Sequence, residues 1–174
     1  LANPLAVKVE DINGVGVSGL MIDFSVISGD AALSTDDVVN FSGNIAVEAE
    51  TGVLDAPMTT SSDAAASNGK YIFAPYASEN YEQGLARYSV YVPTAGTFYI
   101  HLRYKAEADN SNSIYLTAPG IDKKYIKFGL TSEWDWQVLA NTTYLQQGFN
   151  EIIIYNREPL TKIDKLVLSN NPSY

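Results

Sequence analysis

The sequence predicts an all-β protein, an antiparallel β-sandwich, and three observations lead to this prediction. Apolar side chains alternate with polar ones along residues 97–104, which is the period of a half-buried strand. Turn-forming residues such as those at 93–96 separate the apolar stretches at intervals of about ten residues. No window of about eleven residues or more has the periodicity of an amphipathic helix.

The individual strands follow from the same patterns. Tyr88, Val90 and Val92 form one alternating strand, and the alternation at 97–104 forms the next one after the turn. Residues 152–154 are all isoleucine, so we expect a central strand that is covered on both faces. Short strands joined by regular turns are typical of a two-sheet sandwich.

Residues 1–40 are expected to form a separate β segment, followed by the sandwich over residues 41–174. Two apolar stretches at 5–20 and 22–30, the first with an Asn-Gly turn, fit three strands. This segment resembles the first half of the immunoglobulin-like domains of bacterial invasins, and a complete domain needs about 100 residues. A half domain needs cover for its apolar face and strand edges. The cover can come from the sandwich, from a neighbouring domain of a larger protein, or from strands of another subunit.

The composition limits the partners that the chain can bind. The net charge of −9 argues against nucleic acid, whose phosphates require a basic face. It also argues against anionic membranes and sulfated glycans, unless a local basic patch overrides the total charge. There is no cysteine and no apolar run of about eighteen residues, so we expect neither disulfides nor a membrane span. Because the chain begins at Leu1, we expect a processed mature protein or an excerpt.

Several segments, in order, resemble the sugar-binding β-sandwich modules of carbohydrate-binding families six and thirty-five. They are residues 45–50, 66–72, 88–100, 148–154 and 157–168. The resemblance implies a jelly-roll, galactose-binding-like fold in a secreted or cell-surface protein. It also implies a non-catalytic module whose partner is a neutral polysaccharide or oligosaccharide.

Three carboxylates form a candidate calcium site. Glu48 and Glu50 lie two apart on an expected strand, so both should point to one face. Asp164 shares a face with apolar residues that should enter the core, where an unpaired carboxylate is costly. In the resembled families two glutamates and an aspartate at these places hold a structural calcium, with backbone carbonyls that correspond to residues 68–70. The alternative is that both glutamates are solvated and Asp164 pairs with a Lys or Arg.

A sugar site needs an exposed aromatic platform and a few polar groups on loops. Carried over from the resembled families, Trp134 is the expected platform, whereas Trp136 is expected in the core unless a turn separates the two. Tyr76 is the expected second aromatic residue, with Tyr81 as its competitor.

The polar contacts to a sugar are expected from three asparagines. Asn110 and Asn112 match the Asn-Ser segment of the resembled families, although both also suit a turn. Asn156 opens the last loop, where Pro159 and Leu160 replace the usual small polar residues and put that half of the site in doubt. Arg157 and Glu158 of this loop can contact a sugar or pair with each other.

No enzyme motif is present, so we expect no catalysis. The chain lacks phosphate loops, dinucleotide fingerprints, nucleophile elbows and metalloprotease motifs. Its only histidine, His101, is expected on the surface or facing the second sheet, without a catalytic role. An alternative function is a structural subunit of an extracellular filament or surface layer. Such a subunit would self-associate through residues 1–40.

Overall fold

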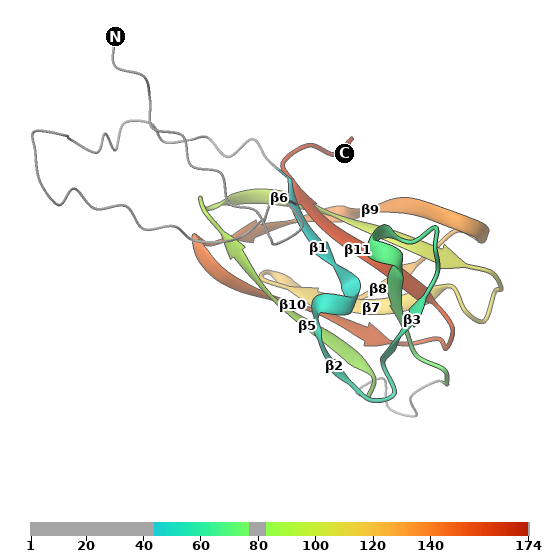
Figure 1. The fold of residues 1–174 in the computed structure, drawn as a ribbon. Coiled ribbons are helices and arrows are strands. Elements are labelled where there is room, and N and C mark those ends of the chain that lie inside the picture. Colours follow the sequence, from blue (N-terminus) through green and yellow to red (C-terminus); the bar gives the residue numbers. More distant parts are fainter. Residues whose placement is uncertain (1–43, 77–82, 174) are drawn as a thin grey trace, which may run out of the picture. The chain divides into compact units, whose positions relative to one another are not determined.

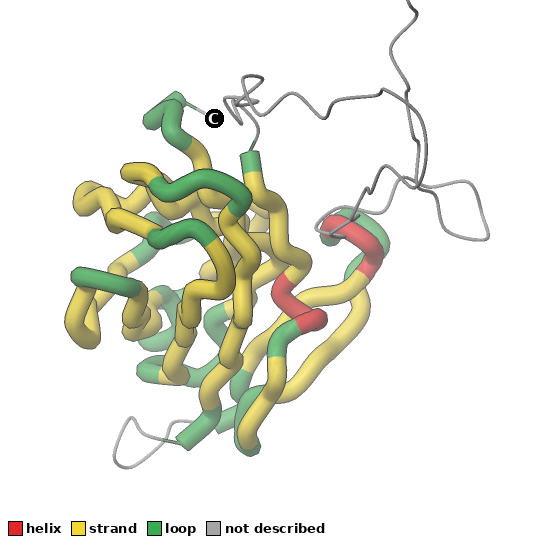
Figure 2. The backbone as a smooth tube through the Cα atoms, turned by 90° about the vertical axis from the view of Figure 1, so that its left-hand side faces the viewer, coloured by secondary structure: helices red, strands yellow, loops and turns green. Residues whose placement is uncertain are grey.

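The computed structural model describes residues 44–76 and 83–173, which form two antiparallel β-sheets packed face to face (Figure 1). Within these residues there is no α-helix. The only helical elements of the described residues are two short 3-10 turns, η1 (Ala49–Thr51) and η2 (Ser67–Gly69), drawn in red in Figure 2. The predicted antiparallel β-sandwich is therefore confirmed.

Over residues 44–76 and 83–173, the two sheets contain eleven strands. The first sheet has the order β3 (Thr59–Ser62), β4 (Lys70–Phe73), β11 (Lys162–Ser169), β6 (Gly96–Ala106), β9 (Thr131–Leu145), and β1 (Ile45–Glu48) also pairs with β11. The second has the order β2 (Val53–Asp55), β5 (Leu85–Val92), β10 (Gly148–Asn156), β7 (Ser113–Ala118), β8 (Ile121–Lys127).

The core lies between the sheets and is filled by the alternating residues that the sequence singled out. Phe98, Ile100, Leu102 and Tyr104 of β6 are all buried, as are the alternate residues of β5. The isoleucine run 152–154 lies in β10, the middle strand of its sheet, which confirms the predicted central position. Ile152 and Ile154 are buried, but Ile153 on the other face is only half-buried, so the expected cover on both faces is incomplete. The turn predicted at 93–96 joins β5 to β6.

One strand residue differs from its prediction. His101 is not on the surface, because only 4% of it is exposed, and it does not face the second sheet, because it alternates with the core residues Ile100 and Leu102. It lies in β6 between β11 and β9, and its Nε2 is 3.2 Å from the carbonyl oxygen of Asn171. The segment after β11 thus covers this ring, and burial lowers the pKa of His101.

Two different strands pair with one edge of strand β11, and this arrangement brings the predicted metal ligands Glu48 and Asp164 close together. β1 pairs with its second half, where Glu48 lies opposite Lys165, and β4 pairs with its start at Ile163. A register irregularity falls between Ile163 and Lys165, at Asp164. Asp164 therefore lies at the junction of β1, β4 and β11.

The predicted immunoglobulin-like segment over residues 1–40, and the self-association assigned to it, lie outside the described residues, as does Tyr81. Among the residues that the structure does describe, none belongs to a helix of the length and apolar character that a membrane crossing requires.

Candidate functional site

Hydrogen bonds tie together the loops at one end of the sandwich. The N–H of Leu160, in the β10–β11 loop, donates to the carbonyl of Ala74 after β4 (2.8 Å). In the β6–β7 loop, the carbonyl of Asn112 accepts from the N–H of Phe128, which follows β8 (2.7 Å). The N–H of Asn112 also donates to Glu158 Oε2 (3.0 Å), which joins the two pairs. The described residues of the chain connections that follow β4, β6, β8 and β10 therefore form one linked group, which we call the end loops.

Tyr76 and Asn156 are neighbours in the end loops. Tyr76 is 61% exposed, whereas Asn156 is only 2% exposed. The Asn156 Nδ2 donates to the Tyr76 carbonyl oxygen (2.9 Å), and its Oδ1 is buried without a hydrogen-bond partner among the described residues. Asn156 thus holds the backbone that carries the exposed ring. It was predicted as a direct sugar contact, but its burial gives it a positioning role instead.

Gly84 is required for this arrangement. Its N–H donates to the Ala56 carbonyl (3.0 Å), and its own carbonyl accepts from the N–H of Asn156 (2.7 Å). Its φ is +73°, and a Cβ atom there would lie 2.9 Å from Pro57 Cδ and 3.1 Å from Asn156 Cβ. Only glycine fits a left-handed residue with so little space.

The two asparagines of the β6–β7 loop have different surroundings. Asn110 is exposed, as a turn residue or a ligand contact requires, but Asn112 is 2% exposed. The backbone N–H of Asn112 donates to Glu158 Oε2 (3.0 Å). The structure therefore gives Asn112 a place in the framework of the loops rather than on their surface.

Glu158 links the β6–β7 and β10–β11 loops, a role that the sequence did not suggest. Its Oε2 accepts from the Ser113 hydroxyl (2.6 Å), and its Oε1 pairs with Arg157 (2.5 Å), which also donates to Ser113 (2.6 Å). The predicted Arg157–Glu158 ion pair is confirmed, and Ser113 extends it. Burial alone would raise the pKa of Glu158, but the bonds from Ser113, Asn112 and Arg157 outweigh it and lower the pKa.

Leu160 has an unusual backbone conformation in the same loop. Its φ is +63°, which costs a residue with a Cβ atom about 1–2 kcal/mol, and half of the residue is exposed. Together with the exposed Tyr76, Leu160 gives the end loops an apolar surface. Strained residues cluster at ligand sites, and the bond from its N–H to Ala74 helps to hold this one.

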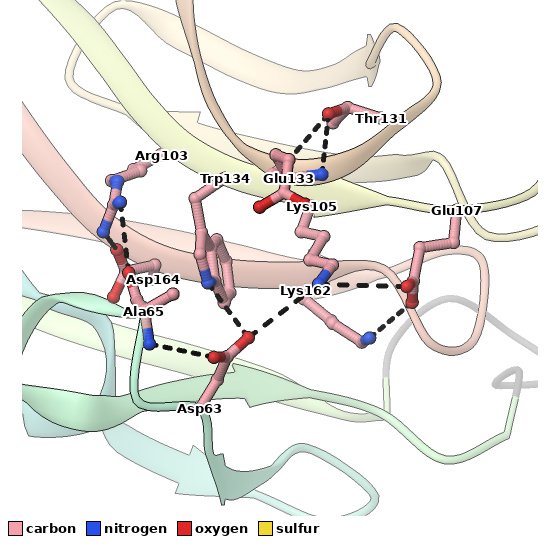
Figure 3. Close-up of polar contacts among 10 residues, drawn as sticks. All are labelled: Asp63, Ala65, Arg103, Lys105, Glu107, Thr131, Glu133, Trp134, Lys162 and Asp164. Carbon is pink, nitrogen blue, oxygen red and sulfur yellow. Dashed lines mark hydrogen bonds and ion pairs between the residues drawn. The ribbon is translucent and has the colours of Figure 1, made fainter.

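Trp134 lies on the outer face of the six-stranded sheet rather than in a loop (Figure 3). Its Nε1 donates to Asp63 Oδ2 (3.1 Å), and its ring is 5.5 Å from that of Tyr71 and 5.7 Å from the Arg103 guanidinium carbon. The indole is half-buried and held on several sides. Its exposed surface is therefore smaller than that of the open aromatic platform that the sequence predicted.

Trp136 is not a core residue, so that prediction was wrong. It is 38% exposed and lies opposite Arg103 in the register of β6 and β9. Both tryptophans stay on one continuous strand, so no turn separates them and they share the outer face. Val138, two residues further along the same face of β9, is 40% exposed as well, so the outer face of this strand is open beyond Trp134.

Charged side chains surround Trp134 in a connected network (Figure 3). Lys105 Nζ lies 3.9 Å from both Asp63 and Glu107, and Lys162 pairs with Glu107 at 2.5 Å. The N–H of Ala65, followed by the bond from Trp134, lowers the pKa of Asp63 despite some desolvation. This network neutralises most of the local charge, so this face of the sheet attracts neither anions nor cations strongly.

The three predicted calcium ligands converge on the junction beside β11. Glu48 ends β1, but Glu50 lies in η1, so the prediction that both sit on one strand was wrong. The 3-10 turn nevertheless directs both carboxylates toward η2. Glu48 Oε1 accepts from Ser67 (2.9 Å), and Glu50 Oε1 accepts from Asn68 (2.8 Å).

The other half of this cluster is already paired with cations. Asp164 is fully buried and forms an ion pair with Arg103, which is the alternative that the sequence left open. Glu48 pairs with Lys165 (2.7 Å). Burial raises the pKa of Asp164, although a backbone bond from Ser67 and the Arg103 guanidinium act against it.

Three oxygens of the cluster lack a partner. Glu48 Oε2, Glu50 Oε2 and Asp164 Oδ1 are buried and accept no hydrogen bond in the part of the chain described. Such orphaned acceptors are costly, and hard oxygens of this kind are the ligands that calcium takes. Over residues 44–76 and 83–173, however, no three acidic or histidine side chains form a ready-made metal site. Backbone carbonyls of η2 and a shift of the cation pairs would have to complete one.

Comparisons with known proteins agree with this architecture. No family model matches the sequence, and no curated protein matches it either. Among solved structures, a family 35 carbohydrate-binding module from Clostridium thermocellum matches with 24% identity and a TM-score of 0.58, over 71% of this chain and 97% of the module. The native structure of a family 35 module from the same organism matches with 18% identity and a TM-score of 0.60, over 72% and 97%. The described sandwich has the fold of these modules.

Enzymes also match, but only in part. A Podospora anserina GH26-CBM35 β-(1,4)-mannanase is 17% identical, with a TM-score of 0.61, over 74% of this chain and 28% of the enzyme. A Phanerochaete chrysosporium exo-β-1,3-galactanase is 15% identical, with a TM-score of 0.60, over 72% and 29%. The chain thus spans nearly all of the separate modules and less than a third of either enzyme.

Proposed function

We propose that this chain is a non-catalytic module of an extracellular or cell-surface protein and binds neutral polysaccharide or oligosaccharide through its end loops. The observation that carries the proposal is the exposed Tyr76 ring, whose backbone is fixed by the buried Asn156. An exposed ring on a held backbone can stack on the apolar face of a sugar at little cost in entropy. The likeness to solved carbohydrate-binding modules supports the ligand class.

Binding at the end loops would combine stacking with hydrogen bonds. Tyr76 supplies the ring, Leu160 widens the apolar surface, and Asn110 supplies an exposed amide at the edge. The Glu158–Ser113 link holds these loops in place before a ligand arrives, which limits the ordering cost of binding. Such a site gives weak binding to one sugar, and its value lies in keeping the protein near a polymer.

A panel of embedded polysaccharides tests this function. Native electrophoresis of the full chain should show retardation by at least one neutral polymer, while release of reducing ends from that polymer stays at the level of a protein-free control. Mobility that no neutral polymer changes would contradict binding, and release of reducing ends by the purified chain would contradict the non-catalytic role.

We also propose a structural calcium at the junction of β1, β4 and β11. The orphaned oxygens of Glu48, Glu50 and Asp164 would hold it, together with carbonyls near residues 68–70. Bound there, the ion would supply positive charge among three carboxylates. The ion would then join the first and last strands of the sandwich, because Glu48 belongs to β1 and Asp164 to β11.

Thermal unfolding in calcium and in chelator tests the metal site. Calcium at a hundredfold excess over its dissociation constant should stabilise the wild type by about 2.7 kcal/mol. Glu50→Gln should remove this effect, because it replaces one orphaned oxygen by an amide nitrogen. Glu151→Gln, which changes an exposed glutamate of β10, is the matched control and should keep it. Equal unfolding temperatures for the wild type in calcium and in chelator would exclude the site.

A further inference from the structure

The hydroxyl of Tyr88 holds the turn that carries Glu50. Tyr88 lies in β5 of the five-stranded sheet, and only 3% of it is exposed. Its hydroxyl donates to the carbonyl oxygen of Ala49 (2.9 Å), the first residue of η1. Because η1 carries the chain from β1 in one sheet to β2 in the other (Figure 1), this bond fixes the point at which the chain changes sheets.

Gly52 makes room for the Tyr88 ring at the end of η1. A Cβ atom at Gly52 would lie 2.6 Å from Tyr88 Cε1 and 3.2 Å from the carbonyl oxygen of Arg87. The backbone of Gly52 is extended, with φ −67° and ψ 157°, which other residues adopt as well. Glycine is therefore needed here for space and not for its conformation, and the ring packs directly against the backbone.

The bond from Tyr88 acts on the peptide unit that precedes the side chain of Glu50. The Ala49 carbonyl and the Glu50 N–H belong to one planar unit, so a hydrogen bond to the oxygen also limits the direction in which Glu50 extends its side chain. The same oxygen accepts from the N–H of Gly52, but at 3.4 Å. Tyr88 thus donates the shorter of the two bonds that hold this peptide.

Glu50 is held at its other end by η2. Its Oε1 accepts from Asn68 Nδ2 (2.8 Å), while its Oε2 is one of the orphaned oxygens at the junction of β1, β4 and β11. Restraint at the backbone through Tyr88 and at the carboxylate through Asn68 leaves Glu50 few ways to turn. The arrangement therefore keeps the orphaned oxygen at the junction.

The charge of Glu50 acts on Tyr88 in return. Burial, followed by the negative charge of Glu50, raises the pKa of Tyr88. The hydroxyl therefore keeps its proton near neutral pH and remains a hydrogen-bond donor. Its bond to Ala49 is present under the conditions in which a carboxylate site binds a cation.

We propose that Tyr88 is a positioning residue for cation binding, whose hydroxyl holds Glu50 in the orientation in which Oε2 can bind calcium. This inference rests on the calcium site proposed above and adds a residue that touches no ion itself. Calcium takes about six to eight oxygens, so water must replace any ligand that turns away. Groups that orient a metal ligand without contacting the metal typically contribute about ten- to hundredfold in affinity.

Calorimetric titration of the full chain with calcium chloride, after metal has been removed with chelator, measures this contribution. Tyr88→Phe keeps the ring and removes only the hydroxyl, so it should bind calcium about tenfold more weakly than the wild type. Thr143→Val is the matched control, because it also removes a buried hydroxyl that donates to a backbone carbonyl, that of Pro119 (2.5 Å). Thr143 belongs to β9, which pairs with none of the strands of the junction, so this variant should keep the wild-type affinity.

A second variant disturbs the same bond without removing the hydroxyl. Gly52→Ala should push the Tyr88 ring away from η1 and should therefore also weaken calcium binding. Unfolding temperatures of all variants in chelator separate this effect from a general loss of stability. Such a loss lowers the unfolding temperature of Thr143→Val as well, but a positioning role lowers the calcium affinity only in Tyr88→Phe and Gly52→Ala.

Each result decides the proposal. Weaker calcium binding by Tyr88→Phe and Gly52→Ala, with Thr143→Val like the wild type, supports it. An affinity within about twofold of the wild type in Tyr88→Phe, or an equal loss in Thr143→Val, would overturn it and leave the calcium site standing. If Tyr88→Phe does not fold, Gly52→Ala decides in the same way. No calcium binding by the wild type would overturn the calcium site and this inference together.

Discussion

Arg103→Met is the perturbation whose effect the structure specifies best. Asp164 is fully buried, and Arg103 is the cation that pairs with it. Methionine keeps much of the length of the side chain but removes the charge, so a buried carboxylate loses its counter-ion. Breaking a buried pair in this way typically costs about 3–5 kcal/mol.

The loss of unfolding free energy in Arg103→Met has an upper limit, because Asp164 can bind a proton rather than stay buried as an unpaired anion. The unfolded carboxyl has a pKa of about 3.9, and each pH unit above this value adds about 1.36 kcal/mol, so protonation at pH 7 costs about 4 kcal/mol. At pH 5 the same step costs about 1.5 kcal/mol. Since 22% of the Arg103 side chain is exposed, we expect a loss of about 2–4 kcal/mol at pH 7.

The sign of the pH dependence follows from the pKa of the variant. Without Arg103, the folded pKa of Asp164 rises further above the unfolded value, so the folded state binds the proton more tightly. The loss in Arg103→Met should therefore shrink as pH falls from 7 to 5. The bond to Ala65 and the contact with Trp134 are lost at every pH and give a constant part.

Urea unfolding followed by tryptophan fluorescence at pH 5, 6 and 7, with chelator present, measures this loss. Arg87→Met is the matched control, because Arg87 pairs with Asp55 while both side chains stay more than 40% exposed. Exposed pairs are worth about 1 kcal/mol or less, without a comparable pH dependence. A loss below about 1 kcal/mol at pH 7 in Arg103→Met, or an equal loss at pH 5 and pH 7, would refute the reasoning.

Three further changes test the end loops by thermal and urea unfolding. Gly84→Ala should cost about 2 kcal/mol or more, since it adds left-handed strain and a contact with Pro57, and wild-type stability would contradict the packing at Asn156. Leu160→Gly should raise the unfolding free energy by up to about 1 kcal/mol, because the strain relieved exceeds the entropy that glycine adds to the unfolded chain; a clear loss would show that the left-handed conformation is unstrained. Glu158→Gln should be less stable than the wild type near pH 6. As its folded pKa is lowered, the advantage of the wild type is present above about pH 4.5 and disappears as pH falls through the folded pKa, whereas a constant difference would argue against the Glu158 link.

The strand pattern was predictable because period-two burial leaves a direct trace in the sequence. Phe98, Ile100 and Leu102 had to share a buried face, and the isoleucine run of β10 had to lie in a central strand. His101 and Trp136 were misjudged for one reason. Their burial depends on what lies over each strand, and only the sheet order and the segment after β11 determine that.

The candidate sites were predictable only in part. Asp164 stood out, because a carboxylate among apolar residues is costly wherever it lies. Glu158 and Gly84 gave no such indication, since their importance comes from residues far away in the chain, Ser113 and Asn156. The alignment of Tyr155, Tyr115 and Tyr125 across β10, β7 and β8 was likewise hidden, because the register of three strands, rather than any spacing in the sequence, brings these residues together.

The most direct test of the central claim compares Tyr76→Ala with Tyr144→Ala in gels that contain the neutral polysaccharide retarding the wild type. Both changes remove an exposed tyrosine ring, but only Tyr76 belongs to the end loops. The account predicts that Tyr76→Ala migrates as in a blank gel while Tyr144→Ala is retarded like the wild type. Unchanged retardation of Tyr76→Ala would contradict it.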